Sequence, residues 1–168
     1  KYEFGRGHTG MDLHVVCENT DLNEVPKFIL NPRGGTPLID AGCATIDRVG
    51  EHLSNLSERE RPEKVIFVVV TDGMENQSKE FKRDDLVRRI EHQRSKYKWT
   101  IMFLGANQDA VEVGKSYGVL QGHSMTYAAT KGGVQSTSRS LHQKLKKMRG
   151  ASSQEYAVNA ISAVSEDL

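Results

Sequence analysis

Short apolar runs and longer amphipathic stretches alternate along this chain. The clearest run covers residues 65–70, is rich in β-branched side chains and stops abruptly at a Thr-Asp-Gly turn that contains Asp72. An unbroken apolar run of this length is typical of a strand buried on both faces, as in a parallel sheet. A second run at 99–104, ended by a Gly-Ala-Asn turn, predicts another buried strand.

The amphipathic stretches predict helices between the strands. Thr36 is the expected N-cap of the first long helix, with Pro37 in its first position because proline has no N–H to satisfy. The pattern predicts further strands at 2–4, 11–17 and 124–128, and helices at 37–56, 82–96, 109–117, 132–148 and 156–164. This alternation predicts an α/β fold with a mainly parallel sheet that helices cover on both faces.

The composition is that of one folded domain spanning residues 1–168. Hydrophobic residues make up 37% of the chain and charged residues 27%, which excludes a disordered protein. The net charge of +1 gives no reason to expect binding to nucleic acid or to an anionic membrane. A basic group at 144–149 is interpreted as the solvated face of a helix.

The sequence shows no targeting signal. No apolar run is long enough to cross a membrane, and no basic segment followed by an apolar one opens the sequence as in a secretory signal. Cys17 and Cys43 lie outside any CxxC or Cys/His group, so we expect them to stay reduced as packing residues. These features predict a cytoplasmic protein.

Two polar loops are expected at one edge of the predicted sheet. Thr36 lies at a helix start after Gly34 and Gly35, and Asp72 lies at the carboxyl end of a strand. Ligands bind at this edge in open α/β sheets, because the loops there converge on a crevice. A hydroxyl and a carboxylate are hard oxygen ligands that suit Mg²⁺, Ca²⁺ or Mn²⁺. The Asp-Gly pair also suits an ordinary turn, so this segment alone leaves both interpretations open.

Three segments carry a family pattern. They are GGTPLIDA at 34–41, VIFVVVTDGMEN at 65–76 and IMFLGANQDA at 101–110. In this order and spacing they resemble the von Willebrand factor A (vWA) domain, most closely its small intracellular bacterial and phage versions. The resemblance covers most of the chain. It implies a doubly wound, Rossmann-like sheet and a metal-ion-dependent adhesion site (MIDAS).

In that family the site holds one Mg²⁺ or similar ion through three loops, and a partner's Glu or Asp carboxylate completes the coordination. The resemblance matches Thr36 to the threonine of the second loop. It matches Asp72 to the aspartate of the third loop, which we expect to hold the ion through a water. The rim of the site is expected to include Gly35, Gly73, Asn76 and Asn107.

The family's first metal loop, Asp-x-Ser-x-Ser, does not occur in this sequence. The chain opens with Lys1 rather than Met, so we expect an N-terminally incomplete domain whose first strand, metal loop and helix precede it. A separate polypeptide that supplies the missing strand is the alternative. With only two of the expected ligands present, we expect these residues alone to bind Mg²⁺ weakly.

The leading functional hypothesis is a non-catalytic, metal-dependent module that binds a protein partner through an acidic residue. One alternative is a degenerate vWA-like domain that binds partners without a metal. Another is a Mg²⁺-dependent, phosphate-handling hydrolase that uses Asp72, although the sequence contains no P-loop and no nucleophile elbow. Glu75 and Asp109 are the plausible sources of its second carboxylate, and both have simpler interpretations, in a loop and as a helix cap.

Overall fold

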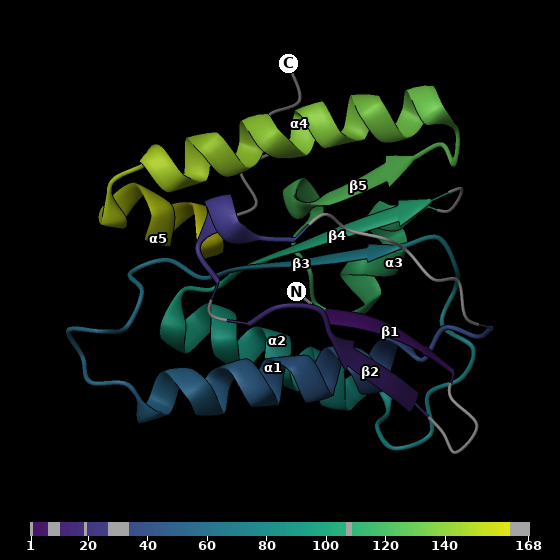
Figure 1. The fold of residues 1–168 in the computed structure, drawn as a ribbon, viewed down its shortest axis with the longest axis horizontal. Coiled ribbons are helices and arrows are strands. Elements are labelled where there is room, and N and C mark those ends of the chain that lie inside the picture. Colours follow the sequence, from purple (N-terminus) through teal and green to yellow (C-terminus); the bar gives the residue numbers. More distant parts are fainter. Residues whose placement is uncertain (1, 7–10, 19, 27–33, 107–108, 162–168) are drawn as a thin grey trace.

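The computed structural model describes residues 2–6, 11–18, 20–26, 34–106 and 109–161 (Figure 1). Its strands are β1 (Tyr2–Arg6), β2 (Met11–Val15), β3 (Ile66–Thr71), β4 (Thr100–Ala106) and β5 (Ser124–Tyr127). Its helices are α1 (Leu38–Asn55), α2 (Arg83–Tyr97), α3 (Ala110–Ser116), α4 (Lys131–Gly150) and α5 (Ser153–Ile161). Short 3₁₀ turns lie at Leu22–Glu24 and Gln121–His123.

Strands β3, β4 and β5 form a three-stranded parallel sheet in that order. Ile66 of β3 pairs with Thr100 of β4, and Phe103 of β4 pairs with Ser124 of β5. The three carboxyl ends therefore lie on one edge of the sheet. The predicted α/β class with parallel strands is confirmed.

Strand β3 is an edge strand, which corrects the prediction that it is buried on both faces. Val70 is 54% exposed, and residues 66–69 are only partly buried. The physical reason is that β3 hydrogen-bonds to β4 alone among the strands that the structure describes. Strands β1 and β2 form a separate antiparallel hairpin, which packs against α1 and lies on the β3 side of the sheet (Figure 1).

The main hydrophobic core lies between the sheet and helices α1, α2 and α3. Its buried members are Leu38, Ile39, Cys43, Ile46, Leu86, Ile90, Trp99, Ile101, Phe103, Ala110, Tyr117 and Val119. Because side chains alternate along a strand, Met102 and Leu104 face the opposite side, where α5 contacts β4 and α4 contacts β5. The hydroxyl of Tyr156 in α5 donates to the Val65 carbonyl oxygen at 2.6 Å, which fixes α5 to the start of β3.

The predicted helices and strands all occur, with their ends shifted by a few residues. Helix α5 was expected to begin at Tyr156 and begins at Ser153 instead. The reason is a capping box: the Ser152 N–H donates to Glu155 Oε2 at 2.8 Å, and the Glu155 N–H donates to Ser152 Oγ at 3.2 Å. The predicted end of this helix at residue 164 lies outside the described residues. Of the helices that the structure describes, none combines the length and apolar character that a membrane span needs.

Candidate binding site at the carboxyl edge of the sheet

The loop after β3 forms a tight turn that presents Asp72 to solvent. Thr71, the last residue of β3, is buried, whereas Asp72 is exposed. The Thr71 hydroxyl donates to the Gly73 carbonyl oxygen at 2.8 Å and accepts from the Gly73 N–H at 3.3 Å. The Thr71 side chain therefore sets the path of the turn, and the Asp72 carboxylate lies at the carboxyl edge where a ligand can reach it.

The Thr36 hydroxyl lies directly against Gly73. A Cβ atom placed on Gly73 would come within 2.6 Å of Thr36 Oγ1, which is closer than real Cβ contacts allow. A glycine is therefore required at this position by the close approach of Thr36. The structure brings Thr36 to the turn that carries Asp72, so the two predicted ligands lie on neighbouring loops at one edge. Gly35, with a φ of 82°, begins the loop that delivers Thr36.

Asn76 fixes the backbone of Thr36. The Thr36 N–H donates to Asn76 Oδ1 at 2.8 Å, and the Asn76 N–H donates to the Thr36 carbonyl oxygen at 3.2 Å. This reciprocal pair joins two loops that are 40 residues apart in sequence. Asn76, predicted on the rim, therefore positions Thr36. Asn107, the other predicted rim asparagine, lies outside the described residues.

The prediction that Thr36 caps α1 is wrong. Helix α1 begins at Leu38, and its N-cap is Pro37, which makes no side-chain cap hydrogen bond. The free helix amides are satisfied by another loop instead: Ile39 N–H donates to Glu75 Oε2 at 2.9 Å, and Asp40 N–H donates to Ser78 Oγ at 3.1 Å. A carboxylate at the positive end of the helix dipole is favourable, which explains why the Glu75 loop folds onto α1.

Two carboxylates, Glu75 and Asp40, hold this loop in place. Glu75 accepts hydrogen bonds on both oxygens, since Oε1 also takes the N–H groups of Gln77 and Ser78. Asp40 is 2% exposed. Its oxygens accept the backbone N–H groups of Lys79, Glu80 and Phe81 at 2.7–3.3 Å. The signal that could have identified Asp40 is its place among the apolar residues of the first helical turn.

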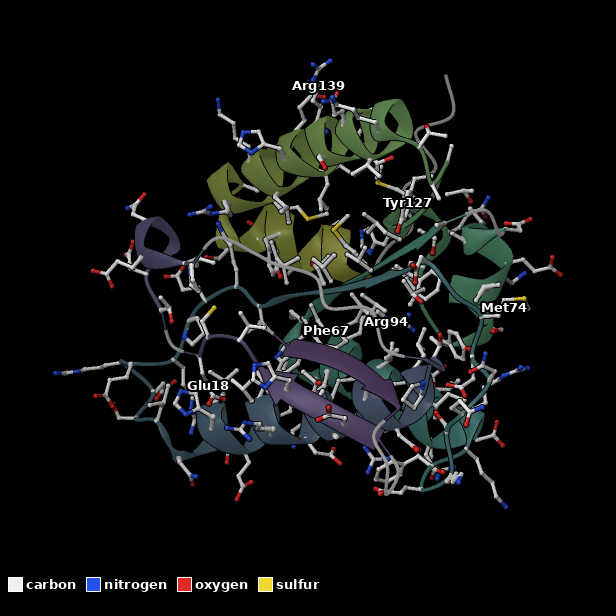
Figure 2. The ribbon with its side chains drawn as sticks, turned by 45° about the vertical axis from the view of Figure 1, so that its right-hand side comes forward. Glu18, Phe67, Met74, Arg94, Tyr127 and Arg139 are labelled. Atoms are coloured by element: carbon white, nitrogen blue, oxygen red, sulfur yellow. The ribbon has the colours of Figure 1, made fainter. Side chains whose placement is uncertain are left out.

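Tyr127, labelled in Figure 2, lies at the end of β5, close enough to Asp72 for the charge of that carboxylate to act on its phenol. Its hydroxyl lies 3.4 Å from the Thr71 carbonyl oxygen, to which it donates. Burial raises the pKa of the Tyr127 phenol, and the nearby negative charge of Asp72 raises it further. The phenol therefore stays protonated beside the carboxylate. Tyr127 was missed because no sequence pattern linked β5 to the turn after β3.

A pocket of about 150 Å³ adjoins the same turn. Gly73 and Met74 form one wall, and Met74 is 69% exposed at its mouth. The Arg83 guanidinium lies 6.0 Å from the centre of the Tyr117 ring on another wall. The remaining lining comes from the apolar residues Leu38, Phe103 and Val113 and from the polar residues Glu75 and Ser116. The pocket is thus mainly apolar, and its lining includes one cationic and one anionic side chain.

Asp109 and Glu75, the two carboxylates considered as partners of Asp72, both hydrogen-bond to backbone N–H groups. Asp109 caps α3, because its Oδ1 accepts the N–H groups of Val111 and Glu112 at 3.1 Å each. Glu75 is bound to the backbone at the start of α1. Both observations agree with the interpretation of these residues as a cap and a loop residue.

The donor set at this edge suits a hard cation in part. The Thr36 hydroxyl and the Asp72 carboxylate are oxygen donors of the kind that Mg²⁺, Ca²⁺ and Mn²⁺ accept. Within the described ranges, no group of three or more His, Cys, Asp or Glu side chains is arranged to hold a metal ion. The residues present therefore fit two positions of a coordination shell and not a complete one.

Comparison with known protein families, with curated proteins and with solved structures gave no match for this chain.

Proposed function

We propose that this chain is a non-catalytic binding module of the vWA type, with a doubly wound sheet and a divalent-cation site at Thr36 and Asp72. The observation that carries the proposal is the approach of the Thr36 hydroxyl to Gly73, beside Asp72. When bound, Mg²⁺ would supply an open coordination position for a carboxylate of a protein partner. Thr36 would bind through its hydroxyl and Asp72 through a bridging water.

The arrangement of the two loops supports this proposal. A cation site needs ligands that are held in place before the ion arrives. Asn76 holds both the N–H and the carbonyl group of Thr36, and Thr71 sets the turn that carries Asp72. The exposed position of Asp72 leaves room for water and for a carboxylate from a partner.

The remaining ligands would come from an additional strand and loop. The open edge of β3 supports this part of the proposal, because a strand added there would end beside Asp72. A strand paired with this edge would bury Val70, which is 54% exposed.

The pocket beside Gly73 suggests how a partner is selected. If a partner residue bound the cation through its carboxylate, the partner residues next to it in sequence would lie close to the Met74 side chain. Methionine adapts its shape to different apolar surfaces, so Met74 would accept an apolar neighbour of that residue. The proposed ligand is therefore an acidic residue flanked by an apolar one.

A metal-free interaction domain is the second candidate. It is supported by the mainly apolar pocket that adjoins Gly73 at the same edge of the sheet. In that case this edge would bind its partner through the pocket alone.

Titration with Mn²⁺ followed by NMR tests the proposal, because this paramagnetic ion broadens nearby amide signals even when it binds weakly. We expect selective broadening at residues 36, 38 and 71–74, and its loss in Asp72→Asn. The matched control is Asp84→Asn, which removes an exposed carboxylate from α2. Broadening that persists in Asp72→Asn, or that is centred elsewhere, would contradict the cation site. A bound acidic peptide with no Mn²⁺ dependence would favour the metal-free candidate.

A further inference from the structure

The net charge of +1 conceals a strong separation of charge along the chain. Residues 113–154 contain seven Lys and Arg residues and no Asp or Glu. The other 126 residues contain 16 Lys and Arg against 22 Asp and Glu, which makes them net acidic. Such an asymmetry points to an anionic partner for the basic part. The basic part is the segment that forms β5 and α4.

Helix α4 carries this charge on its outward face. None of its residues is buried, and Arg139, His142, Lys146 and Arg149 are all exposed. Their spacing of three, four and three residues places them on one stripe of the helix. Figure 2 shows Arg139 on the side of α4 that points away from the sheet. At 1.5 Å per residue the stripe is about 15 Å long.

Polar side chains that can donate hydrogen bonds flank the stripe. Gln135, Ser138 and Gln143 are also exposed on α4 and can donate hydrogen bonds. Lys64 lies at the end of the helix, where its Nζ donates to the Arg149 carbonyl oxygen at 2.9 Å and its charge acts on the Glu155 carboxylate. Among the described residues, no ion pair joins Arg139, Lys146 or Arg149 to an acidic side chain.

We propose that the exposed face of α4 binds the phosphodiester backbone of a nucleic acid. Arg, Lys, Ser and Gln side chains are the groups that contact phosphates and sugars in such complexes. A stable protein interface needs an apolar or aromatic centre, and Val134 is the one exposed large hydrophobic residue on this helix. A membrane-surface helix needs an apolar face turned toward the lipid, and in α4 Leu141, Leu145 and Met148 are partly buried.

This surface is independent of the Asp72 site, and its binding carries no sequence specificity. A stripe of about 15 Å spans about four phosphates of one strand at 3.4 Å each. Neutralising three to four phosphates gives a slope of log K against log salt of about −3 on duplex DNA. Affinity is therefore expected to be weak at physiological salt and to rise steeply as salt is lowered.

Fluorescence anisotropy with a labelled DNA duplex of mixed sequence, and with one of its single strands, tests this proposal. We expect binding with a salt slope of about −3 between about 50 and 200 mM salt. In Arg139→Gln/Lys146→Gln the slope should become shallower by about 2, since two phosphate contacts are lost. The matched control is Arg59→Gln/Lys96→Gln, which removes the same charge from exposed positions outside α4. This control should keep the full slope.

Three results would overturn the proposal. One is the absence of binding to either DNA at the lowest salt. Another is an equal loss in the two double variants, because binding would then follow net charge and not α4. The third is tighter binding of a poly-glutamate peptide of matched charge than of DNA, which would assign α4 to an acidic protein. Circular dichroism of each variant checks that it is folded. We expect every variant to fold, since all four substituted side chains are exposed.

Discussion

The Thr36 hydroxyl occupies the space that a side chain at Gly73 would need, since a Cβ there would lie 2.6 Å from Thr36 Oγ1. This contact joins the start of α1 to the turn after β3. The geometry of the candidate site therefore depends on one glycine, and a substitution there tests the contact directly.

Gly73→Ala is expected to destabilise the protein by about 1–3 kcal/mol, because the added methyl group overpacks the contact with Thr36. Adding Thr36→Ala should recover part of this loss, since it removes the nearest atom. Urea denaturation of the single and double variants measures both effects. Gly132→Ala is the control: this glycine is the second residue of α4, and a Cβ added to it would have no atom within 4 Å, so the change should cost no stability. Additive losses in the double variant would mean that the two residues do not interact.

Asp40→Asn is expected to cost about 2–4 kcal/mol of stability, because the buried carboxylate accepts three backbone N–H groups and an amide replaces one acceptor by a donor. Asp47→Asn on the same helix is the matched control. Its carboxylate pairs with Arg89 at the surface and should contribute less than about 1 kcal/mol. Equal losses in chemical denaturation would contradict the assigned role of Asp40.

Sequence patterns were sufficient to predict the helices and strands. They were also sufficient to predict the edge of the sheet at which the candidate site lies. The apolar run at 65–70 and the Thr-Asp-Gly turn after it placed Asp72 at a strand end. The breaker before Thr36 placed that residue at a helix start. Both predictions rest on local chemistry, which a single sequence displays.

The contacts that hold the site together could not be predicted in the same way. Glu75 and Asp40 act on backbone groups about 40 residues away, so their roles depend on the tertiary fold. The partial exposure of β3 depends on which strands pair with it, and an apolar sequence does not specify its neighbours. The capping of α1 was predicted from Thr36 because local caps are common, but a distant loop supplies it.

Stability is expected to fall as the pH drops below about 6.5, the pKa of an unperturbed histidine. His123 is buried, and burial lowers its pKa, with further lowering from the charges of Lys144 and Arg94. Below a pH of about 6.5 the unfolded chain therefore binds a proton that the folded chain excludes, and protonation favours unfolding. Urea denaturation at about pH 5 and about pH 7.5, on either side of that value, measures the effect. The His123→Gln variant should show a smaller difference between these two pH values, and an unchanged difference would assign the pH dependence to other groups.

Tyr127 reports on the charge at Asp72. The Asp72 carboxylate adds to the effect of burial in raising the pKa of the Tyr127 phenol, so Asp72→Asn should lower that pKa toward its ordinary value near 10. A cation bound at Asp72 should lower it as well, because it offsets the same negative charge. Ultraviolet titration of phenolate formation measures the pKa, and Tyr127→Phe identifies which part of the signal belongs to this residue. The sharpest comparison is wild type with and without saturating Ca²⁺, which stays in solution at the alkaline pH of this titration, repeated in Asp72→Asn. A Ca²⁺-dependent fall in the Tyr127 pKa that disappears in Asp72→Asn places the ion at this carboxylate. A titration curve that Ca²⁺ leaves unchanged would favour partner binding without a metal.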